Sequence, residues 1–68
     1  MPIAVNLDLV LAKRQMKGKA VAELVGISEQ NFSLLRTGKV KGVRFSTLEK
    51  LCEVLQCQPG DILEFEPE

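Results

Sequence analysis

The fold of this chain is decided by residues 18–37, which read GKAVAELVGISEQNFSLLRT. Apolar residues recur at helical spacing on both sides of Gly26, and this pattern predicts a short helix, a tight turn and a second helix. Gly26 should end the first helix because glycine adopts the left-handed conformation without steric cost. Ser28 follows as an N-cap, and Ala22 lets the second helix approach closely. The residues expected in the shared core are Val21, Val25, Ile27, Phe32 and Leu35.

The first three helices are predicted from caps and apolar spacing. Asn6 is a good N-cap for a helix from residue 7 to about 15, which carries apolar residues at spacings of three and four. The next two helices should span residues 18–25 and 29–36. Gly38 is expected to end the second of them.

A basic loop, residues 39–45, leads to a fourth predicted helix. Phe45 is expected to anchor this loop to the core. Ser46 and Glu49 should form a capping box, in which each side chain satisfies a backbone donor at the other's position. We therefore expect the fourth helix to begin after Ser46 and to end near residue 56.

The end of the chain predicts a short fifth helix and a strand. Pro59 fits the first position of a helical turn over residues 59–63. Residues 3–5 and 63–65 are compatible with two short strands that would pair and tie the termini together. The expected fold class is thus all-α, with five helices and short terminal strands as an addition.

Length and composition limit the architecture further. Sixty-eight residues allow one domain, 1–68, with one small core, and only three residues are aromatic, all of them Phe. No apolar run approaches the roughly 18 residues of a membrane span, and the amino terminus lacks a secretory signal pattern. We expect a cytoplasmic protein.

The two cysteines are interpreted as small apolar core residues. Cys52 and Cys57 are expected on one helix, where a spacing of five would point their side chains about 140° apart, so a disulfide is not expected. No His exists, and two thiolates do not complete a zinc site. The sequence predicts no metal and no cofactor. It also offers no nucleophile with a neighbouring base, so we expect no enzyme.

Charge is distributed unevenly although the net charge is zero. Residues 13–44 hold eight basic residues against two acidic ones, a net charge of +6, while acidic residues crowd residues 61–68. A basic middle favours a nucleic-acid partner. The same clusters also fit an ordinary solvated surface.

Taken together, these residues resemble the Xre family of lambda-repressor and Cro-type helix-turn-helix domains. Within residues 18–37 the resemblance rests on apolar residues at positions four, eight, ten, fifteen and eighteen, with Ala at five and Gly at nine. Residues 44–65, RFSTLEKLCEVLQCQPGDILEF, resemble the short stand-alone members of that family. The resemblance implies a five-helix fold and a small transcriptional regulator. A generic helical hairpin is the structural alternative.

The resemblance also implies how DNA would be bound. Residues 29–36 become the recognition helix, which enters the major groove by its amino end. The positions that match the family's base-reading residues are Ser28, Glu29, Gln30, Ser33 and Leu34. Those that match or flank its phosphate contacts are Lys17, Gly18, Lys19, Lys39, Lys41 and Arg44. The implied partner is double-stranded DNA.

Two positions differ from the family's usual residues. Gly18 stands where the family commonly has a Gln that clamps a phosphate, so that only the backbone N–H remains. Leu34 replaces a polar residue on the groove-facing side, where it could contact thymine methyl groups or belong to a protein interface. Leu9 and Leu24 are further leucines expected at the surface.

Two functions are therefore compared. The first is a sequence-specific DNA-binding regulator, a repressor that binds a palindromic operator as a homodimer and has no domain for a small-molecule ligand. The second is an antitoxin-like or anti-repressor module, which keeps the fold but binds a protein partner through Leu34 and its neighbours.

Overall fold

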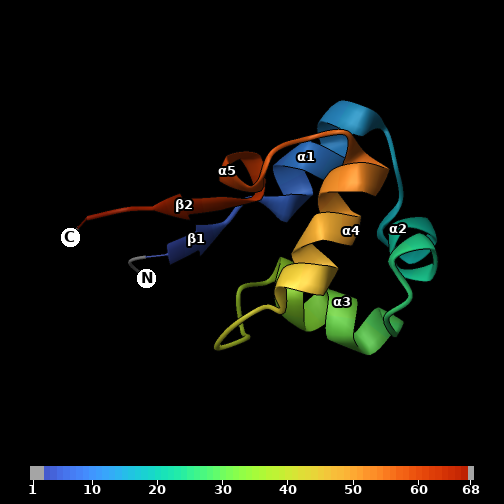
Figure 1. Ribbon diagram of the computed structural model, residues 1–68, viewed down its shortest axis with the longest axis horizontal. Helices are drawn as coiled ribbons and strands as arrows, with labels where there is room; N and C mark the ends of the chain where they lie inside the picture. Colours follow the sequence, from blue (N-terminus) through green and yellow to red (C-terminus); the bar gives the residue numbers. More distant parts are fainter. Residues whose placement is uncertain (1–2, 68) are drawn as a thin grey trace.

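The computed structural model of the protein describes residues 3–67. Their elements are, in chain order, β1 (Ile3–Val5), α1 (Leu7–Arg14), α2 (Gly18–Val25), α3 (Glu29–Arg36), α4 (Phe45–Leu55), α5 (Pro59–Ile62) and β2 (Leu63–Phe65). α4 runs through the middle of the molecule and packs against α1, α2 and α5 (Figure 1). The predicted class, all-α with five helices and short terminal strands, is confirmed.

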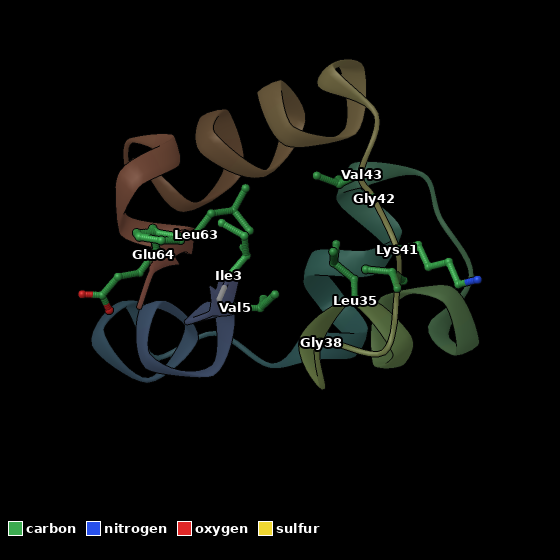
Figure 2. A pocket seen from close by; sticks show the side chains of 11 residues that line it. Ile3, Val5, Leu35, Gly38, Lys41, Gly42, Val43, Leu63 and Glu64 are labelled. Atoms are coloured by element: carbon green, nitrogen blue, oxygen red, sulfur yellow. The ribbon is translucent and has the colours of Figure 1, made fainter. Parts of the chain in front are cut away.

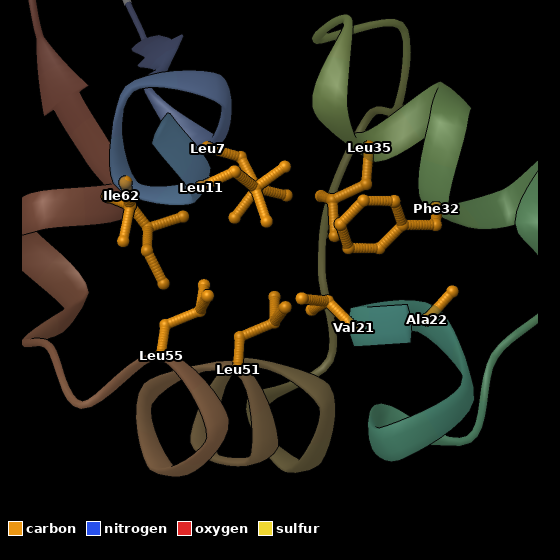
Figure 3. Packing of buried hydrophobic residues seen from close by; sticks show 10 residues of the cluster. Leu7, Leu11, Val21, Ala22, Phe32, Leu35, Leu51, Leu55 and Ile62 are labelled. Atoms are coloured by element: carbon orange, nitrogen blue, oxygen red, sulfur yellow. The ribbon is translucent and has the colours of Figure 1, made fainter. Parts of the chain in front are cut away.

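The core receives side chains from every helix. Figure 3 shows these side chains converging on one interior space between α4 and the other helices. The buried residues are Leu7, Val10, Leu11, Val21, Ala22, Phe32, Leu35, Leu51, Leu55 and Ile62. Burial of each Leu, Ile or Phe side chain contributes about 1.5–3 kcal/mol, so this cluster is the main source of stability. Val25 and Ile27, also expected in the core, are only partly buried and pack against its edge.

The turn between α2 and α3 has the predicted geometry. Gly26 adopts a left-handed conformation with φ of 88°, and its N–H donates to the Ala22 carbonyl over 2.9 Å. The Asn31 N–H donates to the Ser28 hydroxyl over 3.1 Å, which makes Ser28 the N-cap of α3. At the far end of α3, Gly38 has φ of 74°, one residue beyond the Thr37 C-cap. The caps predicted for this segment are therefore confirmed.

The two terminal strands pair antiparallel. Ile3 lies opposite Phe65 and Val5 lies opposite Leu63. Asn6 precedes α1 as predicted, but its side chain does not cap the helix. Its amide donates instead to the Glu64 carboxylate over 3.2 Å, and its backbone N–H donates to the Ile62 carbonyl over 2.7 Å. Asn6 therefore joins the start of the chain to its end.

The predicted start of α4 was wrong. The helix begins at Phe45 with Arg44 as its N-cap, and no side chain makes a cap hydrogen bond. The Leu48 N–H already donates to the Arg44 carbonyl, so Ser46 lies inside the helix and cannot cap it. Phe45 does not anchor the loop, since 81% of its surface is exposed. Around the axis of α4, Phe45 lies on the same side as Cys52 and about 120° from the buried Leu51.

The carboxyl end of α4 is capped by a side chain from α1. Arg14 donates through Nε to the Leu55 carbonyl and through Nη2 to the Gln56 carbonyl, each over 2.7 Å. Gln56 adopts a left-handed conformation, which ends the helix where it was predicted to end. A guanidinium at this position satisfies carbonyls that have no helical partner and complements the helix dipole.

The cysteines are free, and both pack against the core as predicted. However, Cys57 lies beyond the end of α4, so the two do not share a helix. The Cys57 N–H donates to the Cys52 carbonyl over 3.1 Å. Burial raises the pKa of the Cys57 thiol, and neighbouring Cys52 adds to the shift. The thiol is therefore protonated at neutral pH, as expected of an apolar filler.

Within residues 3–67, no helix is both long enough and apolar enough to cross a lipid bilayer.

Replacing Gly26 by Ala tests the turn. A Cβ at Gly26 would meet no atom within 4 Å, so the only cost is the left-handed backbone. We expect Gly26→Ala to lower the free energy of unfolding by about 1–2 kcal/mol. Urea titration followed by far-ultraviolet circular dichroism measures this, since the chain lacks Trp and Tyr. Gly60→Ala is the control, because Gly60 has equally open surroundings without a positive φ. Equal stability of the two variants would contradict the prediction.

Replacing Arg14 by Met tests the α4 cap. Met keeps an aliphatic stem but removes two charge-assisted hydrogen bonds to the Leu55 and Gln56 carbonyls. The free energy of unfolding should fall by about 1–2 kcal/mol. Lys13→Met removes the same charge from the neighbouring exposed position and should leave the urea midpoint nearly unchanged. A midpoint shift of the same size in both variants would show that charge, and not the cap, is responsible.

Candidate nucleic-acid interface

α3 presents one face to the core and the opposite face to solvent. Phe32 and Leu35 are buried against α2 and the rest of the core. At about 100° per residue, Gln30 lies roughly 160° around the helix from Phe32. Ser33 and Leu34 flank Gln30 on the same outward face. The packing of α3 therefore determines which side chains can reach a partner.

The five residues predicted to read bases are all exposed. They are Ser28, Glu29, Gln30, Ser33 and Leu34. Among residues 3–67, the side chains of Glu29 and Gln30 form no hydrogen bond or ion pair with the protein. Their carboxylate and amide are thus available to a ligand. Ser28 differs, because its hydroxyl oxygen already accepts from the Asn31 N–H, which leaves its O–H and one lone pair for a partner.

The residues predicted to contact phosphate form two groups on opposite sides of α3. Gly18 and Lys19, at the start of α2, line a small pocket with Glu29, Ser33 and Arg36. This is one side of α3, and the exposed Lys17 lies next to it as the N-cap of α2.

The second group follows α3 in the chain. Arg44 lines a pocket with Asn31 and Leu35, which lie on the other side of α3. Lys39 and Lys41 are exposed in the same connecting loop. Gln30 and Leu34 therefore stand between two sets of positive charges. This arrangement suits a helix in a groove whose two walls are phosphate backbones.

Gly18 is a point of close approach between α2 and α3. A Cβ at this position would lie 3.1 Å from both the Arg36 Nη1 and the Phe32 Cε2 atoms. Arg36 in turn places its Nε 3.3 Å from the Asp8 carboxylate of α1. The guanidinium thus covers the start of α2, where a longer side chain would otherwise extend.

Sequence reasoning counted Arg36 among the basic residues but gave it no role in the site. The signal available in the sequence was a basic residue in the last turn of the predicted recognition helix. Its contact with Gly18 comes from residues far apart in the chain, so spacing could not reveal it. Arg14, another residue of the basic segment, has its guanidinium bound to the α4 carbonyls.

Leu34 is the only apolar residue predicted on this face, and 39% of its surface is exposed. Leu9 and Leu24 are also exposed, as expected, but they lie on α1 and α2. The three leucines come from different helices. On the outward face of α3, Leu34 is thus a single apolar residue among polar ones.

Comparison with known proteins agrees with this geometry. The family of Cro/C1-type helix-turn-helix DNA-binding domains matches residues 6–68. YozG of Bacillus subtilis strain 168, an uncharacterized HTH-type transcriptional regulator, is 52% identical over 65 residues, which cover 96% of this chain and 77% of that protein. The crystal structure of a candidate DNA-binding protein from Bacteroides fragilis gives a TM-score of 0.80 at 26% identity, covering 91% of this chain and 98% of that one. With its matching motif, fold and exposed α3 face, the chain belongs to the Cro/C1-type helix-turn-helix family of DNA-binding transcriptional regulators.

Proposed function

We propose that this DNA-binding regulator is a repressor that recognises a palindromic operator as a homodimer, through one domain spanning residues 1–68. α3 enters the major groove by its amino end. The observation that carries the proposal is the outward face of α3, where the unpartnered Gln30 lies between two basic groups. A bound α3 would block access of other proteins to the same stretch of DNA, which is the simplest means of repression for a protein of this size.

Direct base contacts are assigned to the outward face of α3. Gln30 can pair with N6 and N7 of adenine, and Glu29 can accept from N4 of cytosine. Ser28 and Ser33 hydroxyls can donate to a base edge or a phosphate. Leu34 is placed to pack on a thymine methyl group. These contacts specify the sequence.

Phosphate contacts supply affinity and position. Lys17, the Gly18 N–H and Lys19 would hold one DNA strand at the start of α2, where the helix dipole also attracts an anion. Lys39, Lys41 and Arg44 would hold the other strand. Arg36 joins the first group, because its Nη1 atom would lie 3.1 Å from a Cβ at Gly18, the position where the family commonly has a Gln.

The homodimer is proposed because the surface of one α3 that can contact bases is small. One α3 spans too few base pairs to define a site in a genome. A two-fold dimer would place a second α3 about one helical turn, or roughly 34 Å, along the DNA and double the number of bases read.

A protein-binding module is the second candidate, and the exposed Leu34 together with the acidic residues near the carboxyl end favours it. Leu34→Gln separates the two functions. A DNA reader should keep its affinity within about 1–3 kcal/mol and change its preferred base at one position. An anti-repressor or antitoxin-like module should lose its protein partner.

Two single substitutions, one at Gln30 and one at Lys19, test which residues contact bases and which contact phosphates. After selection of a preferred site from random duplexes, Gln30→Ala should weaken binding to that site by about 1–3 kcal/mol and relax specificity at one base pair. Lys19→Met should weaken binding to all sequences equally and reduce the slope of log K against log salt by about one. Fluorescence anisotropy at several salt concentrations measures both effects.

Lys50→Met is the matched control. Lys50 is exposed on α4 and lies 3.9 Å from the Glu53 carboxylate, outside both basic groups. Its loss should leave affinity and salt slope unchanged. If no site is selected and binding has no salt slope, the proposed function is wrong. If Gln30→Ala leaves the preferred sequence intact, Gln30 is not a base-reading residue.

A further inference from the structure

An open apolar groove lies between the terminal strands and the loop that joins α3 to α4. Its volume is about 640 Å³. In Figure 2, Ile3 and Val5 of β1 face Leu35 and Val43 across the open space. The apolar residues that line it are Ile3, Val5, Leu35, Val40, Val43, Leu63 and Phe65.

The strand side of the groove is poorly covered. Ile3 is 49% exposed and Phe65 is 64% exposed, although both are large hydrophobic residues. β1 and β2 have three residues each and form a sheet of only two strands, which is marginally stable in water without a further packing partner. A small domain of this kind commonly gains stability from association. The groove is therefore a surface that a partner would stabilise.

The two edges of the groove carry opposite charges. Glu64 and Lys41 both line it, and Figure 2 shows their side chains pointing away from the groove on opposite sides. Glu66 and Lys39 are exposed close by in the chain and extend each charge. Among the described residues, no ion pair joins Glu64 to Lys41 within the chain. Glu64 accepts from Asn6 through Oε2 only, so its other carboxylate oxygen and the Lys41 ammonium remain for a partner of opposite charge.

A second copy of this chain has the complementary charges in the required places. A two-fold rotation about an axis that runs along the groove places the acidic edge of each copy against the basic edge of the other. The same rotation brings the two apolar walls together. Such a contact is self-complementary, as an interface between identical subunits must be. Gln30, Ser33 and Leu34 do not line the groove, so the base-reading residues stay free. Lys41 is shared, because it lines the groove and is also assigned to a DNA phosphate.

We propose that this groove is the homodimer interface, with a second copy of the chain packed against Ile3, Phe65 and the residues between them. The inference rests on the proposed function, since it gives the homodimer its contact surface. It adds a role for the terminal strands and for the acidic residues of β2, which DNA binding does not use.

The interface is tested by the mass of the protein in solution without DNA. Sedimentation equilibrium of the full chain should show a concentration-dependent dimer. Phe65→Ser removes an exposed ring from both copies, so the dimer dissociation constant should rise roughly a hundredfold. Leu24→Ser is the matched control, because Leu24 is 62% exposed on α2, away from the groove. It should leave the dissociation constant unchanged.

Charge reversal provides a second test that does not depend on Phe65. Glu64→Lys and Lys41→Glu should each weaken the dimer about three- to tenfold, because each creates like-charge contacts in both halves of the interface. The double variant should recover the original dissociation constant. Circular dichroism of each variant checks that the fold is retained after loss of the Asn6 contact to Glu64.

Three outcomes overturn the inference: a monomer at all concentrations, a dimer unaffected by Phe65→Ser, or a double variant as weak as the single ones. If the protein is a monomer and its groove binds an apolar small molecule or another protein instead, the first of these outcomes applies and the inference is wrong. Because these measurements contain no DNA, they are separate from the proposed function. A groove-dependent dimer that selects no operator would refute repression alone, and a monomer that selects a site would refute the interface alone.

Discussion

The left-handed turn at Gly26 sets the angle at which α3 leaves α2, and both the core and the exposed face of α3 depend on that angle. Ala22 and Phe32 are buried where the two helices cross, and Gly18 leaves room for the Phe32 ring at the other end of α2. Because Phe32 and Leu35 are fixed inward, Gln30 is fixed outward. A change in the turn would therefore alter stability and recognition together.

The basic residues of this chain either make contacts that hold the fold together or remain exposed to solvent, and the sequence alone does not show which residue does which. Arg14 and Arg36 form part of the basic segment, yet Arg14 caps α4 and Arg36 lies between Asp8 and the start of α2. The lysines of the same segment are exposed and lack such contacts. Arginine suits contacts within the fold because its planar guanidinium can donate to two carbonyls at once, whereas lysine at the surface acts as a solvated point charge.

Helix ends were predicted well where the backbone geometry of one residue determines them and poorly at the start of α4. Gly26, Ser28 and Pro59 impose local backbone geometry, and the structure places each as expected. The Ser46–Glu49 pattern is equally strong as a local signal, yet α4 begins earlier, at Phe45. Leu51 and Leu55 hold the helix in the core, and its first turn is closed by the backbone, since the Leu48 N–H donates to the Arg44 carbonyl. This first turn includes the exposed Phe45 and has no side-chain cap, so a capping pattern alone does not fix where a helix begins.

The sequence by itself determined the order of the elements, the helix–turn–helix crossing and the set of exposed residues on α3. These follow from local rules, since helical spacing, left-handed glycines and caps act over a few residues. Only the tertiary structure decided that Arg36 covers Gly18, that Arg14 caps α4 and that the terminal strands and the loop before α4 enclose an apolar groove. These contacts join residues far apart in the chain, and their geometry depends on how the helices pack around Leu51 and Leu55.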